Sequence, residues 1–310
     1  MVEILIAGLA LGSLYAIVAL GYTMVYGIIE LINFAHGDVF TFGVFVAIPV
    51  LDRLINQSAI NISPLQSLIG IGVAMIVSAL LCGILGVAIE RLAYRPLRNA
   101  PRLAPLITAI GVSLIIENAL FQWQGGGLIG FPSTLNVVQY PFLGGATITN
   151  VQILVIAVAV LMMIGLDLFV NRTNVGKAMR AVAQDREAAA MMGINVDRII
   201  SLTFLIGSAL AGAGAVIYGI EISEVGYDTG FTLGLFAFTA AVVGGIGNIR
   251  GAMLGGILIG VVISWVDNLG SGASAGAGTE WYDVVVFAIL VLILVFRPAG
   301  LLGTNTTEKV

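Results

Sequence analysis

A polar cluster interrupts an otherwise apolar sequence near the N-terminus. The stretch ELINFAHGDVF, residues 30–40, contains Glu30, Asn33, the only histidine, His36, and Asp38, in a chain in which 10% of residues are charged. Such side chains could exchange protons or bind a metal ion, but both kinds of chemistry need further partners, such as a nucleophile, a cysteine or a second histidine. We therefore predict no catalytic residue and no metal site. We expect Asn33, His36 and Asp38 to cap a helix start and to hydrogen-bond one another, fixing a turn that lines or gates a path.

The composition indicates an integral membrane protein. Hydrophobic residues make up 59% of the chain, and its charged fraction is far below the roughly 25% of a soluble domain. The apolar runs approach or exceed the roughly 20 residues that cross a ~30 Å hydrocarbon core as a helix, and they are continuous instead of alternating, which favours helices over a barrel. The expected segments are 4–27, 31–51, 64–89, 105–123, 149–170, 199–220, 230–249, 251–268 and 281–297. We predict an all-α, polytopic transmembrane helical bundle, residues 1–310 forming one domain with eight or nine membrane segments, some of them broken or re-entrant.

The basic residues set the expected orientation, because short cytoplasmic loops concentrate Lys and Arg. If the N-terminus is outside and every segment crosses, the loops 90–104 and 171–198 face the cytoplasm, and only Arg53 of the thirteen basic residues lies outside. The opposite orientation would place twelve of them outside. We therefore expect the N-terminus outside and the C-terminus in the cytoplasm. No positively charged region precedes the first apolar run, so we expect an uncleaved span and no signal peptide.

Acidic residues gather at the other side in this topology. Glu221, Glu224 and Asp228 fall in or next to one outer loop. They either solvate the ends of the helices or form a docking surface for a partner with basic residues.

Glycine predicts a helix break in the second half of the chain. The stretch AVVGGIGNIRGAMLGG, residues 241–256, places Gly244, Gly245 and Gly247 before Asn248, so a continuous helix is not expected to pass through it. Broken helices expose backbone groups that can hold a polar solute, which makes these residues candidates for the transport path or its gate.

Other glycines predict close helix packing. Gly8 and Gly12, and Gly256 and Gly260, repeat at four-residue spacing, which lets helix backbones approach closely in lipid. The lone cysteine, Cys82, lies in an apolar segment and is expected to pack as a small apolar residue.

The loop 171–198 contains the longest polar stretch on the expected cytoplasmic side. Its middle, AMRAVAQDREAAAMMGI, is made of good helix formers and ends at Gly193 in C-cap position, so we predict one short helix at the membrane face. The small residues could fit a groove on another protein while the charged ones orient the helix; the alternative is an interfacial helix without a partner. The candidate coupling residues are Arg180, Asp185, Arg186, Glu187, Ala188, Ala189 and Gly193.

Four blocks in order resemble the high-affinity branched-chain amino acid ABC-transporter permeases, specifically the subunit lettered H. The blocks are GYTMVYGIIELINFAHGDVFTFG (21–43), ERLAYRPLRNAPRLAPLITAIGVSLIIEN (90–118), GKAMRAVAQDREAAAMMGINVDRIISLTFLIGSALAGAGAV (176–216) and AFTAAVVGGIGNIRGAMLGGILIG (237–260). The resemblance covers roughly residues 5–303. Where related permeases commonly have Glu after NFAHG, this chain has Asp38.

The resemblance implies a heteromeric importer in the bacterial inner membrane, surrounded by lipid. A homologous second permease subunit, two ABC ATPase subunits and a periplasmic solute-binding protein would be its partners, and nucleic acid would not. Residues 187–193 are similar to the loop through which such permeases engage their ATPases, although the Leu-Pro of fuller versions is absent. The chain has no phosphate-binding loop of the G-x-x-x-x-G-K-[ST] type. We therefore expect no cofactor in this chain and ATP with Mg²⁺ in the partner ATPases.

The substrate class is less constrained than the transport class. Few charges lie in the apolar segments, so a zwitterion held by helix ends suits the interior better than a strongly charged solute, and the resemblance implies branched-chain or other neutral amino acids. Urea and short amides stay open. Two other classes also stay open: a stand-alone channel or carrier that uses Glu117 and Asp167, and a membrane-embedded enzyme that depends on His36.

Overall fold

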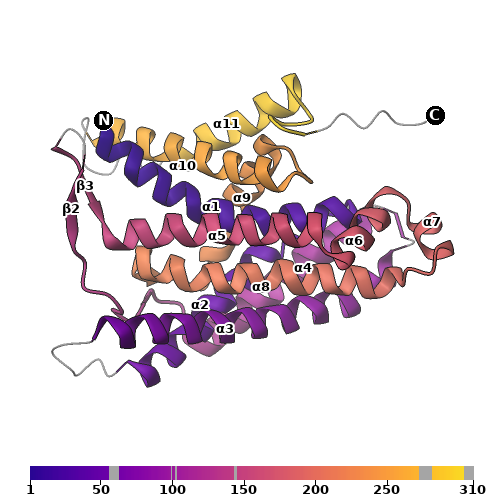
Figure 1. Ribbon diagram of the computed structural model, residues 1–310, viewed down its shortest axis with the longest axis horizontal. Helices are drawn as coiled ribbons and strands as arrows, with labels where there is room; N and C mark the ends of the chain where they lie inside the picture. Colours follow the sequence, from indigo (N-terminus) through magenta and orange to yellow (C-terminus); the bar gives the residue numbers. More distant parts are fainter. Residues whose placement is uncertain (56–62, 99, 102, 143–144, 272–280, 304–310) are drawn as a thin grey trace.

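Helices dominate the computed structural model, which describes residues 1–310 except 56–62, 99, 102, 143–144, 272–280 and 304–310 (Figure 1). Within the described residues the α-helices are α1 (Val2–Ile29), α2 (His36–Leu54), α3 (Pro64–Ile89), α4 (Leu103–Gln124), α5 (Asn150–Arg172), α6 (Asn174–Gln184), α7 (Arg186–Met191), α8 (Val196–Ile222), α9 (Thr229–Gly244), α10 (Ile249–Ser271) and α11 (Trp281–Phe296). A π turn, η1 (Glu90–Tyr94), and a 3₁₀ turn, η2 (Arg95–Leu97), extend α3. Short strands form two antiparallel pairs, β1 (Ile129–Gly130) with β4 (Glu224–Val225) and β2 (Gln139–Pro141) with β3 (Thr147–Thr149).

The predicted polytopic helical bundle is confirmed. Among the described residues, six helices are long and apolar enough to cross a membrane: α1, α3 with its extension, α4, α5, α8 and α10. The shorter apolar helices α9 and α11 occupy two further predicted segments, and α2 occupies the remaining one. With 16 residues, α9 is about 24 Å long and does not span a ~30 Å hydrocarbon core by itself.

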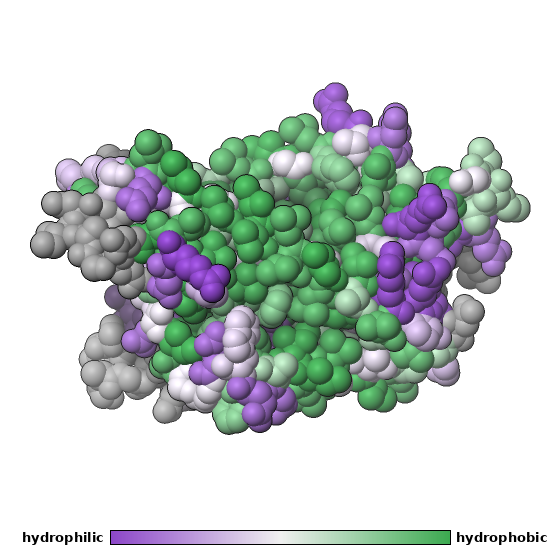
Figure 2. Space-filling view, turned by 90° about the horizontal axis from the view of Figure 1, so that it is seen from below, coloured by the Kyte–Doolittle hydropathy of each residue, from purple (hydrophilic) through white to green (hydrophobic). Residues whose placement is uncertain are grey.

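The long helices run side by side along the long axis of the molecule (Figure 1). The N-terminus and the β2–β3 hairpin lie at one end of the bundle, and α6 and α7 lie at the opposite end. Hydrophobic residues cover the middle of the surface, and hydrophilic ones gather toward both ends (Figure 2). This belt is the surface that a helical bundle presents to lipid.

The contact between α1 and α10 depends on small residues, as the glycine spacing predicts. A Cβ added to Gly12 would lie 2.6 Å from the Cα of Ile257, and one added to Gly256 would lie 2.6 Å from the Cα of Ala16. The neighbour is backbone in both cases and cannot move aside as a side chain can, so a larger residue would push the two helices apart.

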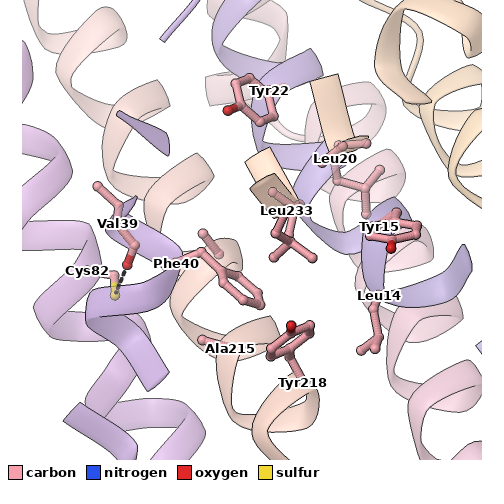
Figure 3. Close-up of a cluster of buried hydrophobic side chains, with 14 of the residues drawn as sticks. Leu14, Tyr15, Leu20, Tyr22, Val39, Phe40, Cys82, Ala215, Tyr218 and Leu233 are labelled. Carbon is pink, nitrogen blue, oxygen red and sulfur yellow. Dashed lines mark hydrogen bonds between the residues drawn. The ribbon is translucent and has the colours of Figure 1, made fainter. Parts of the chain in front are cut away.

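A buried core joins α1 to α2, α3, α8 and α9 (Figure 3). Phe40 of α2 packs edge to face against Tyr218 of α8, with ring centroids 5.3 Å apart. The thiol of Cys82 is buried and donates a hydrogen bond to the Val39 carbonyl over 3.3 Å, so this cysteine packs inside the helix bundle as expected.

The position of α2 corrects the expected depth of the polar cluster. If segments 4–27 and 31–51 both cross, Glu30 to Asp38 are expected near the cytoplasmic end. Glu30 does line a cleft with Arg186, but His36 packs against Gly21 of α1, and Asp38 accepts a hydrogen bond from Ser113, which is near the middle of α4. Glu30 ends α1 with φ +58°, and the following residues lead back into the bundle, so α2 begins inside it.

Helix α9 begins at the same depth as α2. A Cβ added to Gly37 would lie 3.0 Å from the Cα of Gly234 and would also meet the carbonyl of Gly230. The first turns of α2 and α9 therefore pack against each other, which brings the partial positive charges of two helix N-termini close together.

Candidate functional site

The polar residues of the NFAHGD stretch point to different neighbours, which corrects the expectation that they bond one another. The Asn33 side-chain oxygen accepts a hydrogen bond from the Tyr94 hydroxyl over 3.2 Å, and one Asp38 oxygen accepts from Ser113. Residues 36 and 38 are about 200° apart around a helix, so their side chains cannot share a partner. Ala35 is the N-cap of α2 and makes no side-chain capping bond.

His36 is completely buried, and neither ring nitrogen has a hydrogen-bond partner among the described residues. Its ring lies 4.8 Å from that of Tyr22, edge to face. No other candidate for acid–base catalysis bonds to it, and within the described part of the chain no three His, Cys, Asp or Glu residues gather as metal ligands do.

An aromatic layer of Tyr22, Phe34 and Phe238 lies beside His36, where α1, α9 and the turn before α2 meet. Tyr22 of α1 packs against Phe238 of α9 at 6.2 Å, and Phe34, in the turn before α2, packs against Phe238 at 5.9 Å. Sequence reasoning did not single out these rings, because their sequence positions give no sign that three separate segments bring them together.

The predicted break between α9 and α10 is confirmed. Gly245 and Gly247 have φ of +108° and +91°, a region that strains other residues. Asn248 caps α10 by accepting hydrogen bonds from the backbone N–H groups of Arg250 and Gly251, both at 3.1 Å, and it donates to the Leu302 carbonyl at 2.8 Å. This link adjoins the C-terminal end of α1, where a Cβ on Gly27 would lie 3.2 Å from the Cα of Gly247.

The two groups of predicted path residues therefore lie apart. Asn33, His36 and Asp38 surround the start of α2 inside the bundle, whereas the glycine link, starting at Gly244, lies at the end of α9. A cleft of about 490 Å³ opens beside the link, between α1, α5 and α6.

The candidate coupling segment is two helices, not the single helix expected. Asp185 interrupts it with extended backbone, φ −160° and ψ 112°, and its carboxylate accepts hydrogen bonds from the N–H groups of Glu187 and Ala188, both at 2.9 Å. An aspartate that caps the next helix in this way competes with helix continuation. At the other end Gly193 has φ +82°, and it and Ile194 donate to carbonyls of α7, a C-terminal motif that favours glycine.

Arginines join this segment to the rest of the bundle. The Arg186 guanidinium donates to the carbonyl of Ile29, the last residue of α1, over 2.6 Å, and Arg180 donates to the Val170 carbonyl of α5. Ala189 is buried, so this face of α7 packs against the rest of the protein. A cleft of about 330 Å³ lies beside this bond, lined by Asp185 and Arg186 and by the residues that follow α1.

Two methionines form the most exposed part of this segment. Met191 and Met192 are each 82% exposed, and Glu187 is exposed beside them. Large apolar side chains held in solvent are typical of a surface that another protein covers. Sequence reasoning passed over both residues, although they lie within residues 187–193, which resemble the ATPase-binding loop.

A buried ion-pair network holds η1 and η2 against α8. Glu90 is completely buried; it pairs with Arg98 and accepts a hydrogen bond from Ser201 over 2.6 Å. Asp197 pairs with both Arg98 and Arg95. This network ties the basic loop after α3 to the segment that follows α7, and sequence reasoning did not identify it.

We expect Glu90→Ala to destabilise the protein strongly. The substitution removes the buried partner of Arg98, which is 15% exposed and keeps only the half-exposed Asp197, and breaking a buried ion pair costs up to about 3–5 kcal/mol. Asp197→Ala is the matched control: its carboxylate is 43% exposed, so about 0.2–1 kcal/mol is expected. Denaturant unfolding of both variants in detergent measures the difference. Equal effects would show that burial does not set the strength of the network.

The acidic residues at the opposite end surround β4. Glu224 and Asp228 are exposed and Glu221 is half-buried, and the loop is held by a hydrogen bond from the Phe131 N–H to the Ser223 carbonyl at 2.7 Å. The nearby β2–β3 region exposes Tyr140 and Phe142, which sequence reasoning did not name.

The two carboxylates considered for a carrier do not share a site. Asp167 lies near the end of α5 and pairs with Arg250 at 3.1 Å, which corrects its expected place as an interior charge. Glu117 is half-buried on α4, one turn beyond Ser113.

These features define a polytopic helical membrane protein with a polar break inside its bundle. Residues 4–294 match the family described as branched-chain amino acid transport system, permease component. The chain belongs to this family, which confirms the resemblance.

The curated relatives of this chain are named as transport permeases. It is 43% identical over 309 residues to the high-affinity branched-chain amino acid transport system permease protein BraD of Pseudomonas aeruginosa, covering 99% of this chain and 97% of the relative. It is 42% identical to the corresponding LivH of Escherichia coli K12, with 98% and 96% covered. A more distant relative, the fructose import permease protein FruG of Bifidobacterium longum, is 24% identical, with 91% and 86% covered. No solved structure matches the chain.

Proposed function

We propose that this chain is the transmembrane permease subunit of an ATP-driven importer for branched-chain or other neutral amino acids in a bacterial inner membrane. A second homologous permease would complete the pathway, two ATPase subunits would power it, and a periplasmic solute-binding protein would deliver the substrate. The chain would be the conducting subunit, with ATP and Mg²⁺ bound by the ATPases.

The α6–α7 segment is the observation that carries the proposal. It exposes Met191 and Met192 to a partner while Arg186 bonds it to the last carbonyl of α1. A partner that moves α7 therefore pulls on the turn that leads to α2, where the buried polar cluster lies. Such a rigid connection is what coupling ATP-driven closure to a change in the pathway requires.

Charge distribution supports the proposed orientation. The end of the bundle with α6 and α7 carries Arg91, Arg95, Arg98 and Arg198 beside that segment, as a cytoplasmic end does. The opposite end carries the acidic loop around β4. The N-terminus would then be outside and the C-terminus in the cytoplasm, and Glu221, Glu224 and Asp228 would face the solute-binding protein.

The interior suits a substrate with balanced charges. Two helix N-termini can attract a carboxylate, while Asp38 and half-buried Glu117 can attract an ammonium group. Alternating access would open and close the aromatic layer of Tyr22, Phe34 and Phe238. The family and the names of its BraD and LivH relatives favour branched-chain amino acids over a sugar or urea.

Capture of the ATPase subunits tests the proposal. We expect Met191→Asp combined with Met192→Asp to abolish co-purification of the ATPases and ATP-dependent leucine uptake by proteoliposomes, because charged groups would replace the apolar surface of α7. The control is Leu128→Asp combined with Val137→Asp, two exposed residues that precede β1 and β2, which should leave ATPase capture intact. Uptake by the chain alone without ATP would contradict the proposal. Excess valine, but not urea or fructose, should compete with leucine.

A further inference from the structure

A basic cleft lies on the flank of the bundle, apart from the α7 surface and the polar cluster on which the proposed function depends. It has a volume of about 460 Å³ and lies between the end of α3 with its η1 extension and the start of α8. Arg91, Arg95 and Arg198 line it on the polar side together with one acidic residue, Asp197, and Leu202 and Leu205 line it toward the middle of the bundle. The cleft therefore combines a cationic rim with an apolar wall.

Part of this positive charge is not neutralised. Arg95 is paired with Asp197, whereas Arg91 and Arg198 form no salt bridge with any residue that the structure describes. Both side chains are exposed. Two guanidinium groups thus remain available for an anion, and each can donate paired hydrogen bonds to phosphate oxygens.

The surface beside the cleft is of the kind that faces lipid. On α3, Leu81 and Ile84 are exposed, and so are Leu92 on η1 and Leu205 on α8. The view from the α3 side shows this apolar surface running up to the hydrophilic groups at the end of the bundle (Figure 2). A molecule in the cleft would therefore have its charged part at the arginines and an apolar part along the helices.

We propose that this cleft binds the headgroup of an anionic phospholipid. The phosphate lies against Arg91 and Arg198, and the acyl chains follow the exposed faces of α3 and α8. Basic pockets between membrane helices recognise acidic headgroups in this way. Free phosphate would satisfy the arginines but not the apolar wall, and a soluble protein partner would not match the apolar surface that continues into the lipid belt.

Lipid binding to the full chain in detergent tests the site. Native mass spectrometry would count phosphatidylglycerol or phosphatidylcholine bound per chain, with thermal unfolding measured in parallel. The variant is Arg91→Gln combined with Arg198→Gln. Its matched control is Arg172→Gln combined with Lys177→Gln, two exposed basic residues in the α5–α6 region that remove the same charge outside the cleft.

We expect phosphatidylglycerol to bind wild type in preference to phosphatidylcholine and to raise its unfolding temperature. Each lost arginine should weaken binding about fivefold, so the cleft variant should bind about 25-fold more weakly, while the control stays close to wild type. Equal losses in the two variants would overturn the proposal, because they would reflect net charge alone. So would equal stabilisation by inorganic phosphate, which would make the ligand a free anion.

Discussion

Replacing Arg186 with alanine is expected to reduce ATP-dependent uptake by at least tenfold while the ATPase subunits remain bound. The guanidinium bonds the α7 segment to the Ile29 carbonyl at the end of α1. A hydrogen bond to a charged group contributes about 1.5–3 kcal/mol, or roughly 10- to 150-fold in an equilibrium. Without this bond, motion of α7 would no longer reach the turn that leads to α2.

ATP hydrolysis identifies the cause of such a loss. In reconstituted complexes, wild type should hydrolyse ATP faster when the substrate-loaded binding protein is present, and the Arg186→Ala complex should lose this dependence. Arg180→Ala is the matched control, because Arg180 also donates to a helix carbonyl but joins α6 to α5 instead of α1. If uptake falls equally in both variants, the bond to Ile29 has no special role and uptake depends only on how firmly the α6–α7 segment is attached to the bundle. If Arg186→Ala shows wild-type uptake, Arg186 has no role in coupling.

Replacing Gly260 with leucine is expected to prevent stable folding. A Cβ at this position would meet the backbone of Gly12 and lie 2.6 Å from the Gly8 carbonyl oxygen. Overpacking against side chains typically costs about 1–3 kcal/mol, and here the obstacle is the backbone of α1, so the cost should exceed about 3 kcal/mol. The α1–α10 contact would have to open along its length.

A second glycine-to-leucine substitution serves as the control, because it tests whether a larger side chain alone disturbs membrane insertion where no helix packs. Gly165 lies on α5 with no atom within 4 Å of an added Cβ, so Gly165→Leu should insert and fold as wild type does. The monodisperse fraction on size-exclusion chromatography in detergent and the unfolding temperature measure both variants. A folded Gly260→Leu protein with an unchanged unfolding temperature would show that α1 and α10 do not pack as described.

The features that could be predicted from the sequence depend on the properties of residues close together in the chain. Apolar runs identify membrane helices because lipid requires each backbone to satisfy its own hydrogen bonds. Gly193 and Gly245 mark helix ends because φ values near +80° to +110° strain other residues. The basic loops indicate an orientation because short loops rich in Lys and Arg stay on the cytoplasmic side of the membrane.

The tertiary structure decided what those elements bring together. His36 and Asp38 lie deep in the bundle because the chain after Glu30 turns inward, which the hydropathy of residues 31–51 does not reveal. Glu90 finds Arg98 and Ser201, and Asp185 ends one helix by capping the next. Glu90 and its partners come from different helices, and the capping bonds of Asp185 compete with the helix preference of the residues around it. The sequence alone therefore determined the membrane helices and the glycine break between α9 and α10, whereas packing between distant segments determined the polar contacts.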